Sequence, residues 1–116
     1  MEFDSFTVVL LVLRDDAPTF TEDEGAVLQD AHLSFLADLH EDGKLLAAGP
    51  VRDPDSRVRG ISLLNVGAEE AMRLKSQDPA VQAGLYRLVA LPWMTPAGAL
   101  HFTPTRVPRS IADVME

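Results

Sequence analysis

The chain has 116 residues, no cysteine and a formal net charge of −8, and 47% of its residues are hydrophobic. This length suits one globular domain with a buried core, whereas the acidic balance argues against binding to nucleic acid or to an anionic membrane. The lack of cysteine excludes a disulfide framework, thiolate zinc sites and a cysteine nucleophile. The first residues carry no basic leader and the longest apolar run is short, so we expect a soluble cytoplasmic protein.

The first two predicted elements are a strand and a long helix. Residues 6–13, FTVVLLVL, carry apolar side chains toward both faces, which predicts a strand that is buried on both sides. A helix is predicted over residues 22–41, because Thr21 and Glu24 have the spacing of a capping box. Gly43 then provides a left-handed cap after the last turn.

The rest of the chain alternates strands with short helices. Strands are predicted at residues 44–49, 60–66 and 85–93, the last ended by Pro92, and a short helix at 67–77. The polar stretch VRDPDSRVRG between the first two of these strands is typical of a hairpin loop. Asp78 followed by Pro79 predicts one further capped helical turn.

The element order β-α-β-β-α-β predicts a ferredoxin-like α+β fold: a four-stranded antiparallel sheet with two helices on one face. Because the outer face of this sheet is also apolar, we expect a second copy of the sheet to cover it, which gives a homodimer through the sheet face. The alternative cover is the chain's own tail. We therefore divide the chain into a domain of residues 1–93 and a C-terminal extension of residues 94–116 that packs on the domain or the dimer.

His32 lies on the apolar stripe of the predicted long helix, at same-face spacings from Leu28, Phe35 and Leu36. One interpretation is a structural histidine that hydrogen-bonds a carbonyl. The other is a general base or acid, because imidazole titrates near neutral pH. Asp78 is the carboxylate that we pair with it. One of its oxygens can cap the helical turn while the other orients an imidazole.

Other polar residues give weaker signals. His40 is eight residues from His32, about 80° around the helix, so a shared metal is not expected. No spacing in the chain matches a metal motif, and we expect neither a metal nor a cofactor. Arg52, Arg57 and Arg59 have the charge for an anion clamp, but the interleaved acids favour a solvated hairpin loop.

Three segments, in this order, resemble the YciI-like (YCII-related) family: Ala31-His32-Leu33, Gly43 to Pro50, and Asp78-Pro79 through to Tyr86. The resemblance covers residues 6–93. It implies a dimeric ferredoxin-like α+β barrel with a pocket that holds a His-Asp pair, which falls on His32 and Asp78. Where many members carry a basic residue before the Ala-His, this chain has Gln29 and Asp30, which argues against anion binding at that point.

The resemblance also implies a function. His32 is expected to act as general base or acid and Asp78 to orient it, in elimination or isomerisation of a small organic, cyclic substrate without a cofactor. The enzyme is then a dehydrochlorinase-like lyase or an isomerase. Gly49, Pro50 and Tyr86 are expected to bind the substrate at the mouth of a pocket between the long helix and the sheet. The alternative is a non-catalytic homodimer that binds a small molecule or assists an enzyme, with Asp78 only as a cap.

Overall fold

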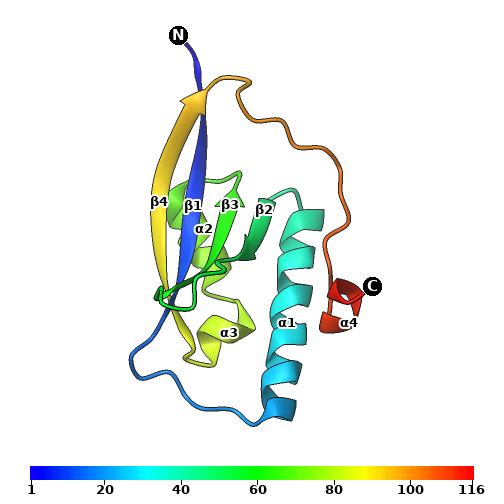
Figure 1. Ribbon diagram of the computed structural model, residues 1–116. Helices are drawn as coiled ribbons and strands as arrows, with labels where there is room; N and C mark the ends of the chain where they lie inside the picture. The colour runs from blue at the N-terminus through cyan, green and yellow to red at the C-terminus, as the bar shows by residue number, and fades with distance from the viewer.

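The computed structural model describes residues 1–116. Its elements, in chain order, are β1 (Phe3–Leu13), α1 (Glu22–Glu41), β2 (Leu45–Pro50), β3 (Val58–Leu64), α2 (Ala68–Lys75), α3 (Pro79–Gln82), β4 (Tyr86–Pro96) and α4 (Ile111–Val114) (Figure 1). The strands form one sheet in the order β2-β3-β1-β4, and every neighbouring pair is antiparallel. The predicted ferredoxin-like α+β fold is confirmed.

The capping signals in the sequence fix both ends of α1. The Thr21 hydroxyl accepts a hydrogen bond from the Glu24 N–H at 3.1 Å, and the Glu24 carboxylate accepts one from the Thr21 N–H at 3.0 Å. Gly43 has a φ of 74°, the left-handed conformation that glycine adopts without steric cost. The predicted helix bounds of 22 and 41 are therefore confirmed.

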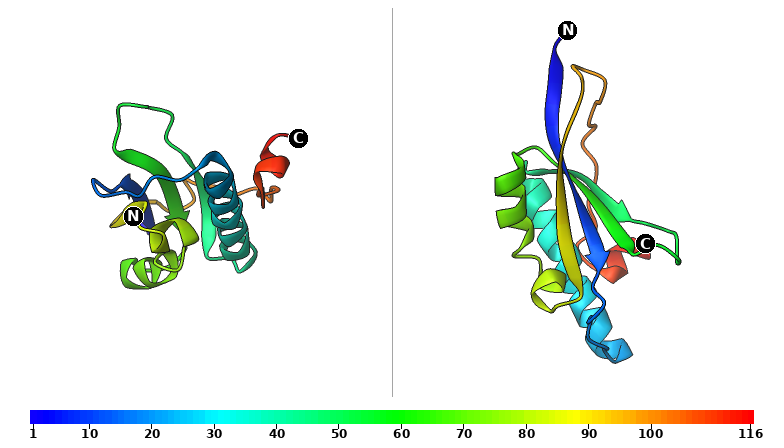
Figure 2. Two further views of the ribbon diagram at one scale, coloured as in Figure 1. Left: turned by 90° about the horizontal axis from the view of Figure 1, so that it is seen from below. Right: turned by 90° about the vertical axis from the view of Figure 1, so that its left-hand side faces the viewer.

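The core lies between the sheet and the helices that cover one of its faces. Val9 of β1, Leu64 of β3 and Ala71 of α2 have no exposed surface, and Leu36 and Leu39 of α1 pack against them. In the right-hand view of Figure 2, α2 lies on one side of the strands and the chain after β4 runs on the other. None of the helices combines the length and hydropathy that crossing a bilayer needs.

The opposite face of the sheet is apolar and largely open. Strand pairing places Trp93 beside Phe6 on this face, and Leu91 and Ile61 also lie on it. The exposed fractions are 46% for Ile61, 45% for Leu91 and 45% for Trp93. The C-terminal tail covers only part of this face, where the rings of Phe6 and Phe102 have centroids 6.1 Å apart. The tail alone therefore does not bury the outer side of the sheet.

Several predicted strand limits differ from the structure: β1 begins at Phe3 and β3 ends at Leu64, and two further differences have a physical consequence. Pro92 does not end β4, which continues to Pro96 while it pairs with β1. Because β4 is the outermost strand, only one of its edges needs a strand partner, and an edge strand tolerates proline. Strand β3 begins at Val58, earlier than predicted, so Arg59 belongs to the sheet and not to the hairpin loop.

Candidate functional site

A cavity of about 540 Å³ lies between α1, the β2–β3 side of the sheet and the C-terminal tail. This volume is in the range of about 300–1,000 Å³ that is typical of small-molecule sites. His32, Gly49, Pro50 and Tyr86, four of the five predicted site residues, line the cavity. The fifth, Asp78, lies behind His32 and has no exposed surface.

His32 and Asp78 form a hydrogen-bonded pair. The Nδ1 atom of His32 lies 2.8 Å from Oδ2 and 3.0 Å from Oδ1 of Asp78. A carboxylate can only accept, so Nδ1 carries the hydrogen, and in the neutral form of the ring Nε2 keeps its lone pair. The His32 side chain is 12% exposed. The arrangement is that of an oriented imidazole whose second nitrogen is available for proton transfer.

Asp78 has the two roles that the sequence allowed. Its Oδ1 atom accepts a hydrogen bond from the Ala80 N–H at 2.9 Å, which caps α3, while Pro79 occupies the first helical position. The same carboxylate holds His32. A wholly buried charge needs several such partners to offset the loss of hydration, and this cap supplies one of them.

Lys75 is a third polar residue at this centre, and the sequence analysis missed it. Its side chain is 0% exposed, and Nζ lies 3.8 Å from Asp78 Oδ2. Nζ also donates a hydrogen bond to Ser62 Oγ at 3.2 Å and lies 5.9 Å from the centroid of the Phe35 ring. Burial lowers the pKa of Lys75, and the Asp78 carboxylate partly opposes this shift. Two basic side chains therefore share one buried carboxylate.

Tyr86 begins β4 and lines the cavity. Burial raises the pKa of its phenol above the usual value, with the nearby Asp78 acting in the same direction and Arg59 in the opposite one. At neutral pH the side chain is thus an uncharged hydroxyl that can donate a hydrogen bond to a ligand.

Arg59 lies at a bulge in the β1–β3 pairing. Leu11 pairs with Gly60 and Val12 with Val58, so Arg59 has no partner residue on β1. Bulges next to sites commonly redirect one side chain, and Arg59 lines the cavity. Its guanidinium makes no hydrogen bond or ion pair within the protein.

By contrast, the Arg57 guanidinium pairs with exposed Asp15 at 2.8 Å. The interpretation as a solvated hairpin is therefore right for Arg57 and wrong for Arg59. No local pattern distinguishes the two arginines, because the bulge depends on how β3 pairs with β1.

His40 also lines the cavity, about 80° around α1 from His32. Its Nδ1 atom lies 2.9 Å from the Leu45 carbonyl oxygen, so Nδ1 donates that hydrogen bond. No three His, Asp or Glu side chains in the structure gather in a way that would hold a metal ion.

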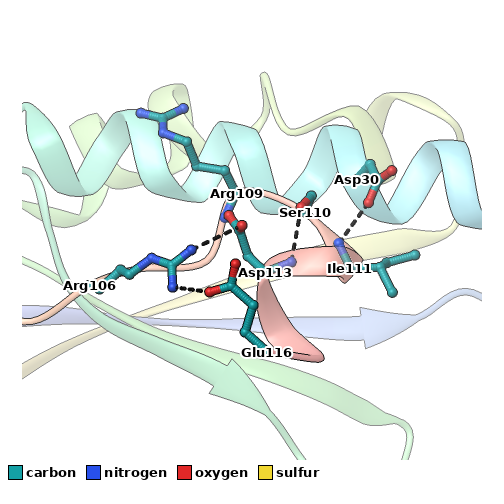
Figure 3. Close-up of polar contacts among 7 residues, drawn as sticks. All are labelled: Asp30, Arg106, Arg109, Ser110, Ile111, Asp113 and Glu116. Atoms are coloured by element: carbon teal, nitrogen blue, oxygen red, sulfur yellow. Dashed lines mark hydrogen bonds and ion pairs between the residues drawn. The ribbon is translucent and has the colours of Figure 1, made fainter.

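The C-terminal tail forms the outer wall of the cavity through residues 105–108. Within the tail, the Arg106 guanidinium pairs with Asp113 at 3.0 Å (Figure 3). The Ile111 N–H donates a hydrogen bond to the Asp30 carboxylate of α1 at 2.7 Å, which fixes α4 against that helix.

Arg109 adds a second attachment of the tail to α1. Its guanidinium contacts Asp38 at 3.0 Å and Glu41 at 2.6 Å. These ion pairs are exposed to solvent. The tail wall of the cavity is therefore held by surface ion pairs and by the contact of α4 with α1, and not by the buried core.

The fold and this cavity define a small ferredoxin-like α+β protein with a histidine and a buried carboxylate at a ligand-sized site. The sequence profile of the YCII-related domain matches residues 8–94, three-quarters of the chain. The chain belongs to the YCII-related domain family. No curated protein sequence matches it.

Two solved structures are similar to this one. The 5-chloro-2-hydroxyhydroquinone dehydrochlorinase from Burkholderia phenoliruptrix, in complex with 2,5-dihydroxybenzoquinone, has a TM-score of 0.53 and 19% identity, covering 76% of this chain and 92% of that one. A dimeric protein of unknown function with a ferredoxin-like fold from Bacteroides fragilis has a TM-score of 0.44 and 16% identity, covering 78% and 95%. At this level of identity, the first likeness establishes the fold.

Proposed function

We propose that this protein is a cofactor-independent enzyme in which His32 exchanges a proton with a carbon atom of a small cyclic or unsaturated organic substrate. The observation that carries the proposal is the His32 Nδ1 atom held 2.8 Å from a wholly buried Asp78 carboxylate, beside a ligand-sized cavity. Asp78 is the orienting residue. Gly49, Pro50 and Tyr86 form the substrate-binding wall.

The chemistry follows from the free Nε2 atom. As a general base, Nε2 takes a proton from a carbon next to a carbonyl group, and the electron pair of the C–H bond moves into the carbonyl to form an enolate. In isomerisation the imidazolium returns the proton to a different carbon. In elimination the electron pair instead expels an anion from the neighbouring carbon, and the imidazolium later loses its proton to solvent. Asp78 stabilises the imidazolium in both cases.

The comparisons favour this class of reaction. The dehydrochlorinase is named for an elimination from a hydroxylated ring, and its complex contains a cyclic enol. A ring of that size fits a cavity of about 540 Å³. For this chain, elimination and isomerisation are both part of the proposal, because both begin with the proton transfer assigned to His32.

The proposal is tested by the exchange of ring hydrogen for deuterium in 2,5-dihydroxybenzoquinone and in a cyclic diketone, followed by proton NMR in heavy water. The protein is expected to accelerate exchange, and His32→Ala is expected to slow it by roughly 100-fold or more. His40→Ala is the matched control, because it removes an imidazole from the same cavity. Exchange that equals the buffer rate, or that is unchanged in His32→Ala, would contradict catalysis and favour a binding or accessory role.

We further propose that the open sheet face forms a homodimer. Ile61, Leu91 and Trp93 are each almost half exposed on this face, and a second sheet would remove them from water. Light scattering should give twice the chain mass of 12.6 kDa. Trp93→Glu should give the monomer mass. Met94→Glu is the control, because Met94 is 60% exposed but points to the other side of the strand. A wild-type mass of one chain would refute the dimer.

A further inference from the structure

The wall of the cavity is basic although the protein is acidic. Acidic residues are 18 of the 116 in the chain, so about three would be expected among the 22 lining residues, yet none of the 22 is acidic. Two arginines and two histidines do line the cavity: Arg59, Arg106, His32 and His40. The rest of the wall is mainly Leu, Ala, Val and Pro. If an apolar site simply excluded charged residues, both acidic and basic side chains would be missing from the wall.

The two arginines are not equivalent. Arg106 is neutralised within the tail by ion pairs with Asp113 and Glu116. Arg59 has no carboxylate partner, although it is only partly exposed. A guanidinium in a partly enclosed apolar site without a counter-charge is costly unless the ligand supplies one. The cavity therefore has one uncompensated positive charge, on the sheet side.

We infer that the ligand of this cavity is a small, mostly apolar molecule with a delocalised oxyanion, a carboxylate or an ionised enol, which Arg59 binds. This inference rests on the proposed function of the cavity as a substrate site. The planar guanidinium matches such a group, because it can donate two parallel hydrogen bonds to it. Tyr86 lines the same cavity, and its phenol can donate a further hydrogen bond to a bound ligand.

The positive charge lies on the sheet side of the cavity, and the helix has no basic residue just before Ala31. Gln29 lines the cavity without charge, and the carboxylate of Asp30 accepts the Ile111 N–H of the tail. The anion contact comes from the bulge in β3 instead. Arg59 lies on the sheet and His32 lies on α1. As His32 removes a proton, negative charge develops on the substrate, and the Arg59 guanidinium is a fixed positive group that stabilises this charge.

The test compares benzoate with benzamide, two probes of one shape that differ in charge, by NMR titration of the wild-type protein. The wild type is expected to prefer benzoate, and to bind the ionised enol 2,5-dihydroxybenzoquinone as well. Arg59→Met should weaken benzoate and enol binding by roughly 10-fold or more and leave benzamide unchanged. Arg59→Lys should keep part of the preference. Arg57→Met is the matched control on the same hairpin, and it should change nothing.

Several results would overturn the inference. These are equal binding of benzoate and benzamide, no binding of any probe, an equal loss in Arg57→Met, or a preference that depends on His32 and not on Arg59. The proposed function is judged separately by deuterium exchange in His32→Ala. If His32→Ala stops exchange while Arg59→Met leaves the benzoate preference intact, the acid–base function stands and the ligand class is wrong. If exchange is absent but Arg59→Met removes the preference for benzoate, the inferred ligand class is kept and the acid–base function is refuted.

Discussion

The cavity has a histidine at each end of its α1 wall, and the two differ in what lies behind the ring. His32 donates from Nδ1 to the buried Asp78 carboxylate, and His40 donates from Nδ1 to the neutral carbonyl of Leu45. They are about 12 Å apart along the helix axis. Both rings keep Nε2 free. A carboxylate stabilises an imidazolium far better than a carbonyl does, so the partner behind the ring, and not its place on the helix, is the reason for proposing His32 as the proton acceptor.

Asp78→Asn should remove most of this difference and have the largest effect. Asparagine keeps the shape and an acceptor oxygen for His32 or the Ala80 N–H, but it loses the charge. Deuterium exchange is expected to fall by roughly 100-fold or more, as in His32→Ala, while His40 keeps its bond to Leu45. Exchange assays with nitrogen NMR of both rings would measure this.

The same variant tests whether Asp78 is only a helix cap. In that case Asp78→Asn would lower stability, since it alters the bond to Ala80, but a folded fraction would exchange deuterium at the wild-type rate. That outcome would mean that the Asp78 carboxylate does not distinguish His32 from His40.

Lys75→Met sharpens the comparison, because Lys75 lies only at the His32 end. The pKa of Lys75 is below its usual 10.5 in the folded protein, chiefly through burial. Between the folded and unfolded values the unfolded chain holds more protons, so this group makes stability rise with pH. The unfolding free energy of wild type relative to Lys75→Met should therefore increase as pH rises from neutral toward 10.5. Urea unfolding measures this difference in unfolding free energy. A difference that stays constant or falls as pH rises would contradict the lowered pKa of the buried Lys75 ammonium.

His40→Ala should have the smallest effect. The variant removes one hydrogen bond to the Leu45 carbonyl, at a cost of about 1 kcal/mol in unfolding free energy, and leaves deuterium exchange unchanged. Chemical denaturation and the exchange assay provide the two readouts. A loss of exchange as large as that in His32→Ala would show that the two ends of the cavity are chemically alike.

The sequence predicted what depends on local signals. The bounds of α1 follow from a capping box and a glycine, and the order of strands and helices along the chain follows from apolar runs between turns. The sequence makes His32 and Asp78 candidates for a pair, but only the family resemblance implies that the two side chains meet, since 46 residues separate them. The end of β4 was misplaced because proline usually ends a strand, and only the position of β4 at the sheet edge allows it to continue past Pro92.

Lys75 and Arg59 could not be predicted from the sequence. Lysine at the end of a short polar helix is usually solvated, whereas Lys75 is buried in tertiary contacts, with its Nζ against Ser62 of β3 and Asp78 at the start of α3. In the sequence, Arg59 is one of several arginines in a predicted loop. Only the bulge opposite Leu11 and Val12 distinguishes it from the others. Both residues depend on contacts between distant segments, which periodicity and capping do not encode.

The most direct test of the His32–Asp78 centre is the tautomer of His32, read from the nitrogen chemical shifts of its two ring atoms at a pH where the ring is neutral. A histidine held by the Asp78 carboxylate carries its hydrogen on Nδ1 and leaves Nε2 bare. We predict that tautomer in the wild type and its loss or weakening in Asp78→Asn. A wild-type ring with the hydrogen on Nε2 would mean that Nδ1 does not donate to Asp78, and it would contradict the proposed acid–base centre.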